Sequence, residues 1–368
     1  MNDFSSLVVY LAVFATSAVL IYLGDKTKKK YLSILGLLAL VLFAGLRFKV
    51  GIDYDNYVRI IEELKNVSLS SYLDSYVSIF EPTLFLSAKL SNFISGGPIL
   101  FFILYSAITV FPFYFAIKKF IPKYSWLAVL LFAFLFFPPS LNAVRQYAAI
   151  SIAFYAIMDY FYPSKNRPHS SRTKLIVLIL FASLLHSSAI TTLLILPVYY
   201  FAKKLSRKNT AQTAILYTIF VAVILVAAEF IISNIYYIPV LNKYAYSLAI
   251  TGGPTPNLIA KIFPVLMSTI FFRKLVDKDE RNLLHFSMSY VALATSMFGF
   301  IVAFGYRLSD YFNIFQIPLI LAVIDLSESK SRQRIYIIIA IIYGLAYFLY
   351  SAFLNNSHGI FPLQFIFS

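Results

Sequence analysis

The sequence predicts an all-α protein that forms a polytopic bundle of membrane-spanning helices. Of its 368 residues, 60 % are hydrophobic and 13 % are charged, whereas about 25 % of the residues in a soluble domain are charged. The mean hydropathy is +0.79. The apolar residues form long runs between short basic linkers, and about 20 apolar residues are enough for a helix to cross the hydrocarbon.

The positive charge is concentrated in the linkers between the apolar runs. The formal net charge is +15, but the cations lie in short clusters between apolar runs, as in the cytoplasmic linkers of membrane proteins. We therefore expect membrane lipid, and no nucleic acid, as a partner. The sequence contains no cysteine, which excludes disulfides, thiolate catalysis and Cys-based metal sites.

The order of runs and linkers predicts the topology. The first run precedes its lysines, which predicts a span that begins outside rather than a cleaved signal peptide. Basic flanks on both sides of residues 175–201 predict two short helices that separate at His186. Placing all basic linkers in the cytoplasm predicts about twelve crossings in one transmembrane domain, residues 1–368. The predicted spans are residues 4–23, 31–46, 99–117, 124–137, 145–161, the pair within 175–201, 211–232, 258–272, 283–304, 311–324 and 335–353.

Three segments are predicted to stay on the external side. Residues 47–79 are too polar to span and predict an external loop, and residues 233–257 predict a second one. Residues 80–95 form a short run that contains Glu81 and meets a Ser-Gly-Gly-Pro breaker. We expect a re-entrant or interfacial helix there.

Three arginines break the charge rule, because Arg47, Arg145 and Arg307 lie at the predicted external ends of helices. Guanidinium groups bind phosphate in a bidentate manner. Arg145 follows a break at residues 138–142, so we expect it in the first turn of a helix, where free backbone N–H groups also favour anions. The alternative is contact with lipid headgroups or structural pairing with carboxylates such as Asp53 and Asp310.

Carboxylates and a histidine near these arginines are candidates for proton transfer. Asp53 could act as a base, bind a hydroxyl or pair with Arg47, whereas Asp55 could be solvated. Glu81 suits either a helix start or a site. His186 could transfer a proton near neutral pH or be a structural residue bonded to the serines that follow it.

Tyrosines and an amide complete the polar motifs. We expect exposed tyrosines to stack on sugar rings or to anchor the chain at the membrane interface. These are Tyr54, Tyr57, Tyr306 and Tyr311, and Gln146 lies beside Arg145.

Five of these segments together resemble a known family. LRFKVGIDYDNY, FEPTLFLSAKL, NAVRQYAAISIAFYAI, ASLLHSSAITTLLILP and YRLSDYF occur in this order, as in the EpsG family, which belongs with the Wzy-type O-antigen and capsular polysaccharide polymerases. The resemblance covers about residues 40–315, and the tail NNSHGIFP is also similar. It places Arg47, Asp53, Arg145, His186 and Arg307 on the family's polar positions. Relatives often have Thr or another small residue where this chain has Tyr54.

The resemblance implies a glycosyltransferase with an architecture like that of the O-antigen ligases, which is GT-C-like. Such an enzyme works at the periplasmic face of the bacterial inner membrane. It moves a growing glycan from undecaprenyl pyrophosphate onto the next lipid-linked repeat unit, without a nucleotide sugar, metal or other cofactor. A chain-length regulator is a further expected partner.

The residues and the resemblance lead to one hypothesis for the site. Arg145 and Arg307 bind the pyrophosphate, and Arg47 binds it too or orients Asp53. Asp53, Glu81 and His186 remain alternative bases. The predicted substrate contacts also include Tyr54, Tyr57, Gln146 and Tyr311. A ligase, a transporter of lipid-linked oligosaccharide and a membrane O-acyltransferase are the alternative functions.

Overall fold

The computed structural model describes residues 2–76, 82–163, 171–205, 257–296 and 306–367. Within these ranges every regular element is a helix, apart from one isolated bridge between Arg47 and Phe365. The predicted all-α class is therefore confirmed. The predicted span 211–232 lies outside the described residues, and so does the loop 233–257 except for its last residue.

Four helices in the described part of the chain are long and apolar enough to cross a membrane. They are Asp3–Thr27, Ile99–Phe120, Arg307–Leu326 and Lys330–Leu354. Shorter apolar helices include Lys30–Gly45, Pro122–Leu135 and Lys261–Ile270. These helices support a membrane protein, whereas the total of twelve crossings stays a prediction.

The described chain divides into two compact units. Unit 1 comprises Met1–Thr191 and Ile335–Ser368, and unit 2 comprises Thr192–Arg334. That the units belong to one transmembrane domain stays a prediction.

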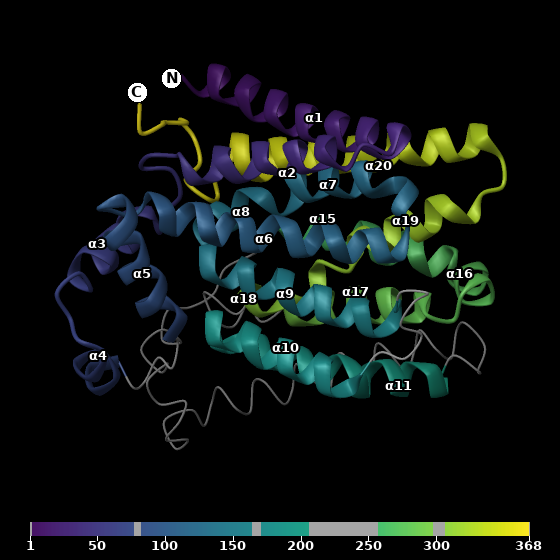
Figure 1. The fold of residues 1–368 in the computed structure, drawn as a ribbon. Helices are drawn as coiled ribbons and strands as arrows, with labels where there is room; N and C mark the ends of the chain where they lie inside the picture. Colours follow the sequence, from purple (N-terminus) through teal and green to yellow (C-terminus); the bar gives the residue numbers. More distant parts are fainter. Residues whose placement is uncertain (1, 77–81, 164–170, 206–256, 297–305, 368) are drawn as a thin grey trace. The chain divides into compact units, whose positions relative to one another are not determined.

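In unit 1 most neighbouring helices run antiparallel (Figure 1), whereas α6 and α9 run parallel, because Lys119 at the end of α6 pairs with Asp159 near the end of α9. Helix α1 packs on α2, α2 on α6, α6 on α9 and α9 on α10. The helices approach closely where side chains are small. At Gly36, for example, a Cβ would lie 2.7 Å from the carbonyl oxygen of Ser17. The helices are α1 (Asp3–Thr27), α2 (Lys30–Gly45), α3 (Tyr54–Glu63), α4 (Leu69–Tyr76), α5 (Pro82–Ser95), α6 (Ile99–Phe120), α7 (Ser125–Leu135), α8 (Phe137–Asn142), α9 (Val144–Phe161), α10 (Arg172–Leu185) and most of α20 (Lys330–Phe348), with short helical turns at Pro122–Tyr124 and Leu349–Leu354. A further turn, Ser187–Leu194, begins in unit 1 and ends in unit 2.

The basic linkers gather at one end of unit 1. Lys118 lies 2.6 Å from Asp25 and joins α6 to α1. Asp159 near the end of α9 pairs with Lys119 at 2.7 Å and with Lys174 at 2.6 Å. The polar motifs occupy the opposite end, because α9 begins there with Arg145 and α10 ends there just before His186.

Several predicted boundaries are confirmed. Helix α9 begins one residue before Arg145, directly after the short helix α8. Helix α10 ends at Leu185, where His186 takes an extended conformation. The region 47–79, predicted as an external loop, contains the short helices α3 and α4, and α5 forms within residues 80–95. The external and interfacial placement of these segments stays a prediction.

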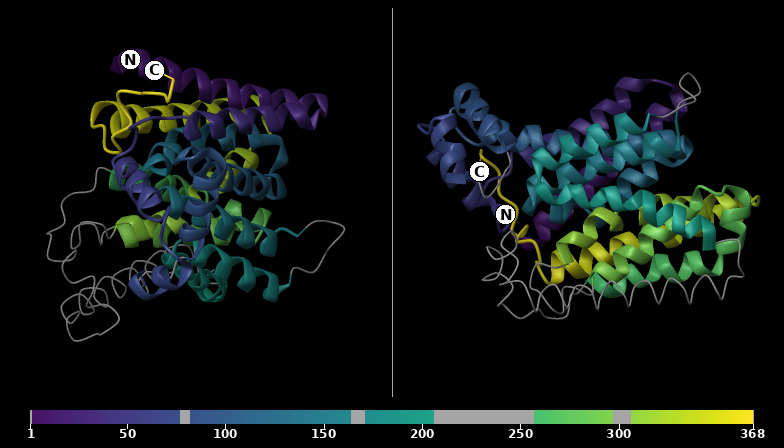
Figure 2. Two further views of the ribbon diagram at one scale, coloured as in Figure 1. Left: turned by 60° about the vertical axis from the view of Figure 1, so that its left-hand side comes forward. Right: turned by 90° about the horizontal axis from the view of Figure 1, so that it is seen from below.

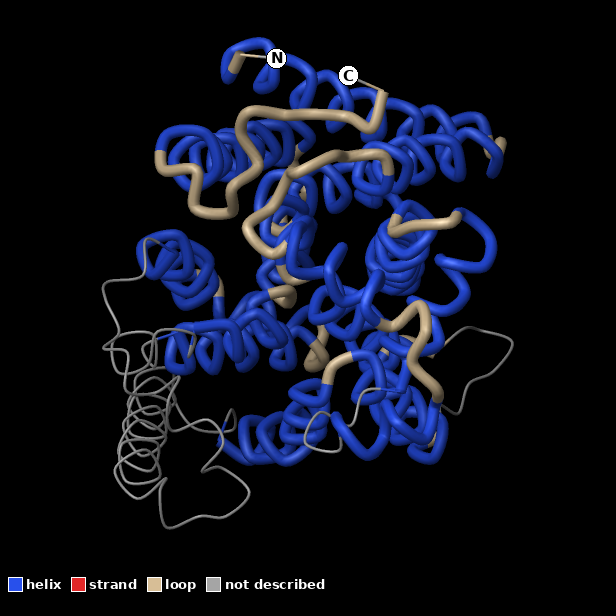
Figure 3. The backbone as a smooth tube through the Cα atoms, turned by 90° about the vertical axis from the view of Figure 1, so that its left-hand side faces the viewer, coloured by secondary structure: helices blue, strands red, loops and turns tan. Residues whose placement is uncertain are grey.

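Both chain ends lie in unit 1, and Figures 1 and 2 show them side by side. The tail after residue 354 is a loop, drawn in tan in Figure 3. The N–H of Leu363 donates to Ser6 Oγ at 2.9 Å, and the hydroxyl of Tyr10 donates to the carbonyl of Ile360 at 3.2 Å. Helix α1 thus holds the tail.

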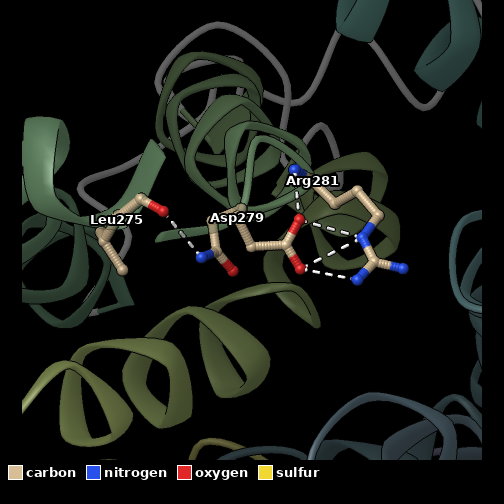
Figure 4. A network of polar contacts seen from close by, with 4 residues as sticks. Leu275, Asp279 and Arg281 are labelled. Atoms are coloured by element: carbon tan, nitrogen blue, oxygen red, sulfur yellow. Dashed lines mark hydrogen bonds and ion pairs between the residues drawn. The ribbon is translucent and has the colours of Figure 1, made fainter. Parts of the chain in front are cut away.

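Unit 2 also has a charged end. Its described helices are α11 (Ile195–Leu205), α15 (Asn257–Ile270), α16 (Phe272–Lys278), α17 (Asn282–Ser296), α18 (Tyr306–Asn313) and α19 (Gln316–Leu326). In the turn between α16 and α17, Arg281 donates to both carboxylate oxygens of Asp279, from Nε at 2.9 Å and from Nη2 at 2.8 Å (Figure 4). Lys278 pairs with Asp325 at the end of α19, at 2.7 Å.

Candidate functional site

Arg47 points into unit 1 rather than out of it. The residue is 1 % exposed. Its Nε donates to the carbonyl of Val50 at 3.1 Å and its Nη2 to that of Leu141 at 3.0 Å, while Nη1 donates to the carbonyl of Ala44. The guanidinium carbon lies 4.3 Å from the centre of the Phe102 ring. These contacts give Arg47 a structural role that differs from the predicted pairing with a carboxylate, because it fixes the loop that follows α2 through backbone carbonyls.

Burial lowers the pKa of Arg47 to about 10, and the neighbouring Tyr10 and Tyr54 act in the opposite direction. The group therefore stays charged at neutral pH. Its charge is stabilised by three carbonyl oxygens and by aromatic faces, both of which attract a guanidinium.

The tyrosines after this loop are buried, so the expectation that Tyr54 and Tyr57 are exposed is wrong. They are 5 % and 8 % exposed. Tyr54 stacks on Phe102 with ring centres 4.9 Å apart, and Tyr57 packs on Phe101 at 5.6 Å. The two residues are three apart in α3 and so share the face that packs inward. Burial raises the pKa of Tyr54, against the lowering effect of Arg47.

The backbone around Asp53 is held by two distant segments. The N–H of Asp53 donates to Asn142 Oδ1 at 2.8 Å. The N–H groups of Gly51 and Ile52 donate to the carbonyls of Gly359 at 2.8 Å and His358 at 3.2 Å. Gly51 has φ +101°, and a Cβ there would lie 2.7 Å from the carbonyl oxygen of Leu141, so a side chain does not fit.

The tail continues this pairing along the loop. The N–H of Phe48 donates to the carbonyl of Gln364 at 2.9 Å, and the N–H of Ile366 donates to that of Leu46 at 3.1 Å. The sequence assigns no site role to the tail or to Asn142. The similarity of NNSHGIFP to the family was the available signal for the tail, and Asn142 had none beyond its place in the break before Arg145.

Arg145 lies in the first turn of α9 and is half-buried. The positive end of the helix dipole lies at such a helix start and favours anions there. Arg145 is also close enough to Tyr105 of α6 to act on it electrostatically. Gln146 beside it is buried.

His186 lies at the same end of unit 1. Its Nδ1 is 2.7 Å from Ser188 Oγ, and the residue is half-buried. Thr83 of α5 donates to the carbonyl of Leu184 at 2.6 Å, two residues before the histidine.

Hydrogen bonds of Thr83 and Ser87 join α5 to the end of α10 and to α6. Ser87 Oγ donates to the carbonyl of Thr83 at 2.6 Å and lies 3.3 Å from the hydroxyl of Tyr105. Asp53 is held by Asn142 just before the start of α9, which carries Arg145, and His186 follows the end of α10 at the same end of the unit. Unit 1 therefore brings Asp53, Arg145 and His186 to one end. Glu81 lies outside the described residues, directly before α5.

The last motif lies in unit 2. Arg307 and Asp310 occupy successive turns of α18 and are half-buried, whereas Tyr311 is 1 % exposed, so its predicted exposure is wrong. The side chain of Tyr306 lies outside the description. Lys261 of α15 is buried and donates to Ser309 Oγ. That Arg307 joins Arg145 in one site stays a prediction.

The family model for the EpsG family matches residues 30–365 of the chain. The chain belongs to the EpsG family. This is a family of Wzy-like polysaccharide polymerases. The match includes Arg47, Asp53, Arg145, His186, Arg307 and most of the tail, and it begins with α2, after the end of α1.

EpsG membership supports a membrane protein with a polysaccharide polymerase-type role. No curated protein and no solved structure matches the chain. Within the described ranges, no group of three or more His, Asp and Glu side chains is arranged to hold a metal ion.

Proposed function

We propose that the protein is a polysaccharide polymerase that transfers a growing glycan from undecaprenyl pyrophosphate to the next lipid-linked repeat unit. It works as a multi-pass glycosyltransferase at the periplasmic face of the bacterial inner membrane. The observation that carries the proposal is the position of Asp53, Arg145 and His186 at one end of unit 1, opposite the basic linkers.

Arg145 has the position of a leaving-group ligand. A guanidinium in the first turn of a helix combines bidentate donors with the positive end of the helix dipole. Such a group stabilises the negative charge that develops on a departing diphosphate. Arg307 is the second proposed ligand, and Arg47 contributes by fixing the loop that carries Asp53.

Attack by a sugar hydroxyl on the anomeric carbon requires a base. In this proposal His186 accepts the proton, and its bond to Ser188 orients the imidazole ring. Asp53 and Glu81 are the alternative bases. Gln146, Tyr54, Tyr57 and Tyr311 are buried, so in this proposal they support the residues around the glycan from within the fold. A chain-length regulator is a further partner.

The test uses the purified full chain with one lipid-linked repeat unit. We expect a ladder of products with the wild type and single, unextended repeats with Arg145→Ala, a loss of at least about a hundredfold, as for other charge-stabilising groups. The control is Arg59→Ala, which removes an exposed arginine from α3.

The ladder also separates the alternatives. A ligase would transfer glycan only to a different acceptor, and a transporter would form no product in detergent. Normal chain lengths with Arg145→Ala would contradict the role of Arg145.

A further inference from the structure

Lys261 is a buried cation that the proposed function does not use. It lies in the second turn of α15 and is 4 % exposed. A lysine ammonium has three N–H donors. Among the residues that the structure describes, its one hydrogen bond goes to a neutral oxygen, Ser309 Oγ.

The charge of Lys261 is not balanced by a direct ion pair. Asp310 acts on it electrostatically, but no carboxylate of the described residues lies within 4.0 Å of the ammonium. Arg307 adds a second cation on the same helix as Asp310. Among the described residues, Lys261 and Arg307 bring two cations, and Asp310 one carboxylate, to α18.

A buried charge without an ion-pair partner is costly, and more so in a protein that spans a membrane. Surface lysines in unit 2 avoid this cost, as Lys203 does with Glu280 at 2.6 Å. An arrangement that keeps an ammonium buried beside a hydroxyl is suited to an anionic ligand that supplies the missing charge.

We propose that Lys261, oriented by Ser309, is part of a phosphate-binding site at α18 that takes the diphosphate of a polyprenyl lipid. This inference rests on the proposed function for the identity of the natural ligand. The hydroxyl of Ser309 fixes the ammonium, whose other N–H groups then bind phosphate oxygens. Arg307 supplies the second positive charge.

The experiment measures binding of farnesyl pyrophosphate to the purified full chain in detergent, by titration calorimetry. We expect Lys261→Met to weaken binding by about tenfold or more, as expected for the loss of a charge-assisted hydrogen bond. Lys261→Arg keeps the charge and should stay within a few-fold of the wild type, and Ser309→Ala should give an intermediate loss. The matched control, Lys203→Met, should bind as the wild type does.

Competition distinguishes the sources of phosphate. Farnesyl pyrophosphate should be displaced by geranylgeranyl pyrophosphate but not by phosphatidylglycerol at the same concentration. Displacement by phosphatidylglycerol would mean a general lipid headgroup site and would overturn the assignment to a diphosphate. Wild-type affinity in Lys261→Met, or a wild type that does not bind the probe, would overturn it as well.

The binding assay does not depend on polymerisation. Diphosphate binding that requires Lys261, without a product ladder, would support this site and contradict the polymerase proposal. A ladder together with normal binding in Lys261→Met would contradict this site alone. If Lys261→Met does not fold, the other two variants decide. Weaker binding in Ser309→Ala beside near wild-type binding in Lys261→Arg would support the site, and wild-type binding in Ser309→Ala would contradict it.

Discussion

Arg47 in unit 1 and Lys261 in unit 2 are both buried cations beside a polar motif, but their surroundings differ. Arg47 donates to three backbone carbonyls and faces the ring of Phe102. Among the described residues, Lys261 donates to one hydroxyl, that of Ser309. Each guanidinium nitrogen of Arg47 donates to a backbone carbonyl, which stabilises the fold, whereas two of the three N–H donors of Lys261 have no partner among the described residues and are proposed to bind a ligand.

The largest effect on stability is expected for Arg47. Arg47→Met removes the donor from three carbonyls, each of which costs about 1–3 kcal/mol when left unsatisfied. We expect a loss of at least ~3 kcal/mol of unfolding free energy, measured by thermal unfolding in detergent. Arg47→Lys should also destabilise the protein, because one ammonium cannot replace the planar fork. Unchanged stability in both variants would mean that Arg47 does not stabilise the fold and so does not differ from Lys261 in this respect.

The second-largest effect on stability is expected from removing the hydrogen bond that holds the backbone of Asp53. Asn142→Leu deletes the acceptor for the N–H of Asp53, and we expect ~1–2 kcal/mol of lost stability. Polymerisation should fall further than this loss explains, because the carboxylate of Asp53 is no longer positioned. Thermal unfolding and the ladder assay, run on the same preparation, separate the two effects. A ladder as long as that of the wild type would show that the anchor is not needed.

Lys261→Met should have little effect on stability. Replacing a buried charge by an apolar side chain of similar length is often neutral or stabilising, so we expect a change within ~1 kcal/mol. Thermal unfolding of Lys261→Met beside Arg47→Met checks the comparison directly. A loss as large as that of Arg47→Met would give Lys261 a structural role.

The smallest effect is expected from the ion pair between Asp279 and Arg281. Burial tends to raise the pKa of Asp279, but Arg281 outweighs it, so the pKa is lowered. A lowered pKa means that this contribution is present above the unfolded value of about 3.9 and is lost as pH falls through the folded value. Because the pair is partly exposed, we expect less than ~1 kcal/mol.

The measurement is the melting temperature between pH 6 and pH 2.5 for the wild type and Asp279→Asn. The variant should lose less stability on acidification, and the exposed control Asp277→Asn should follow the wild type. Parallel curves for the wild type and Asp279→Asn would mean that the ion pair between Asp279 and Arg281 does not contribute to stability.

Local patterns in the sequence were enough to predict the helical membrane class, the start of α9 at Arg145 and the end of α10 before His186. They were also enough to place the basic linkers and the polar motifs at opposite ends of unit 1. Length, breakers and charge act over one or two helical turns, so they can be recognised without knowing the contacts between helices.

Only the tertiary structure revealed that Arg47, Tyr54 and Tyr57 are buried, that Asn142 and the tail hold Asp53, and that Lys261 meets Ser309. These contacts join residues tens to hundreds of positions apart. Whether a charged side chain faces inward depends on what the rest of the chain places opposite it, and no local pattern contains that information.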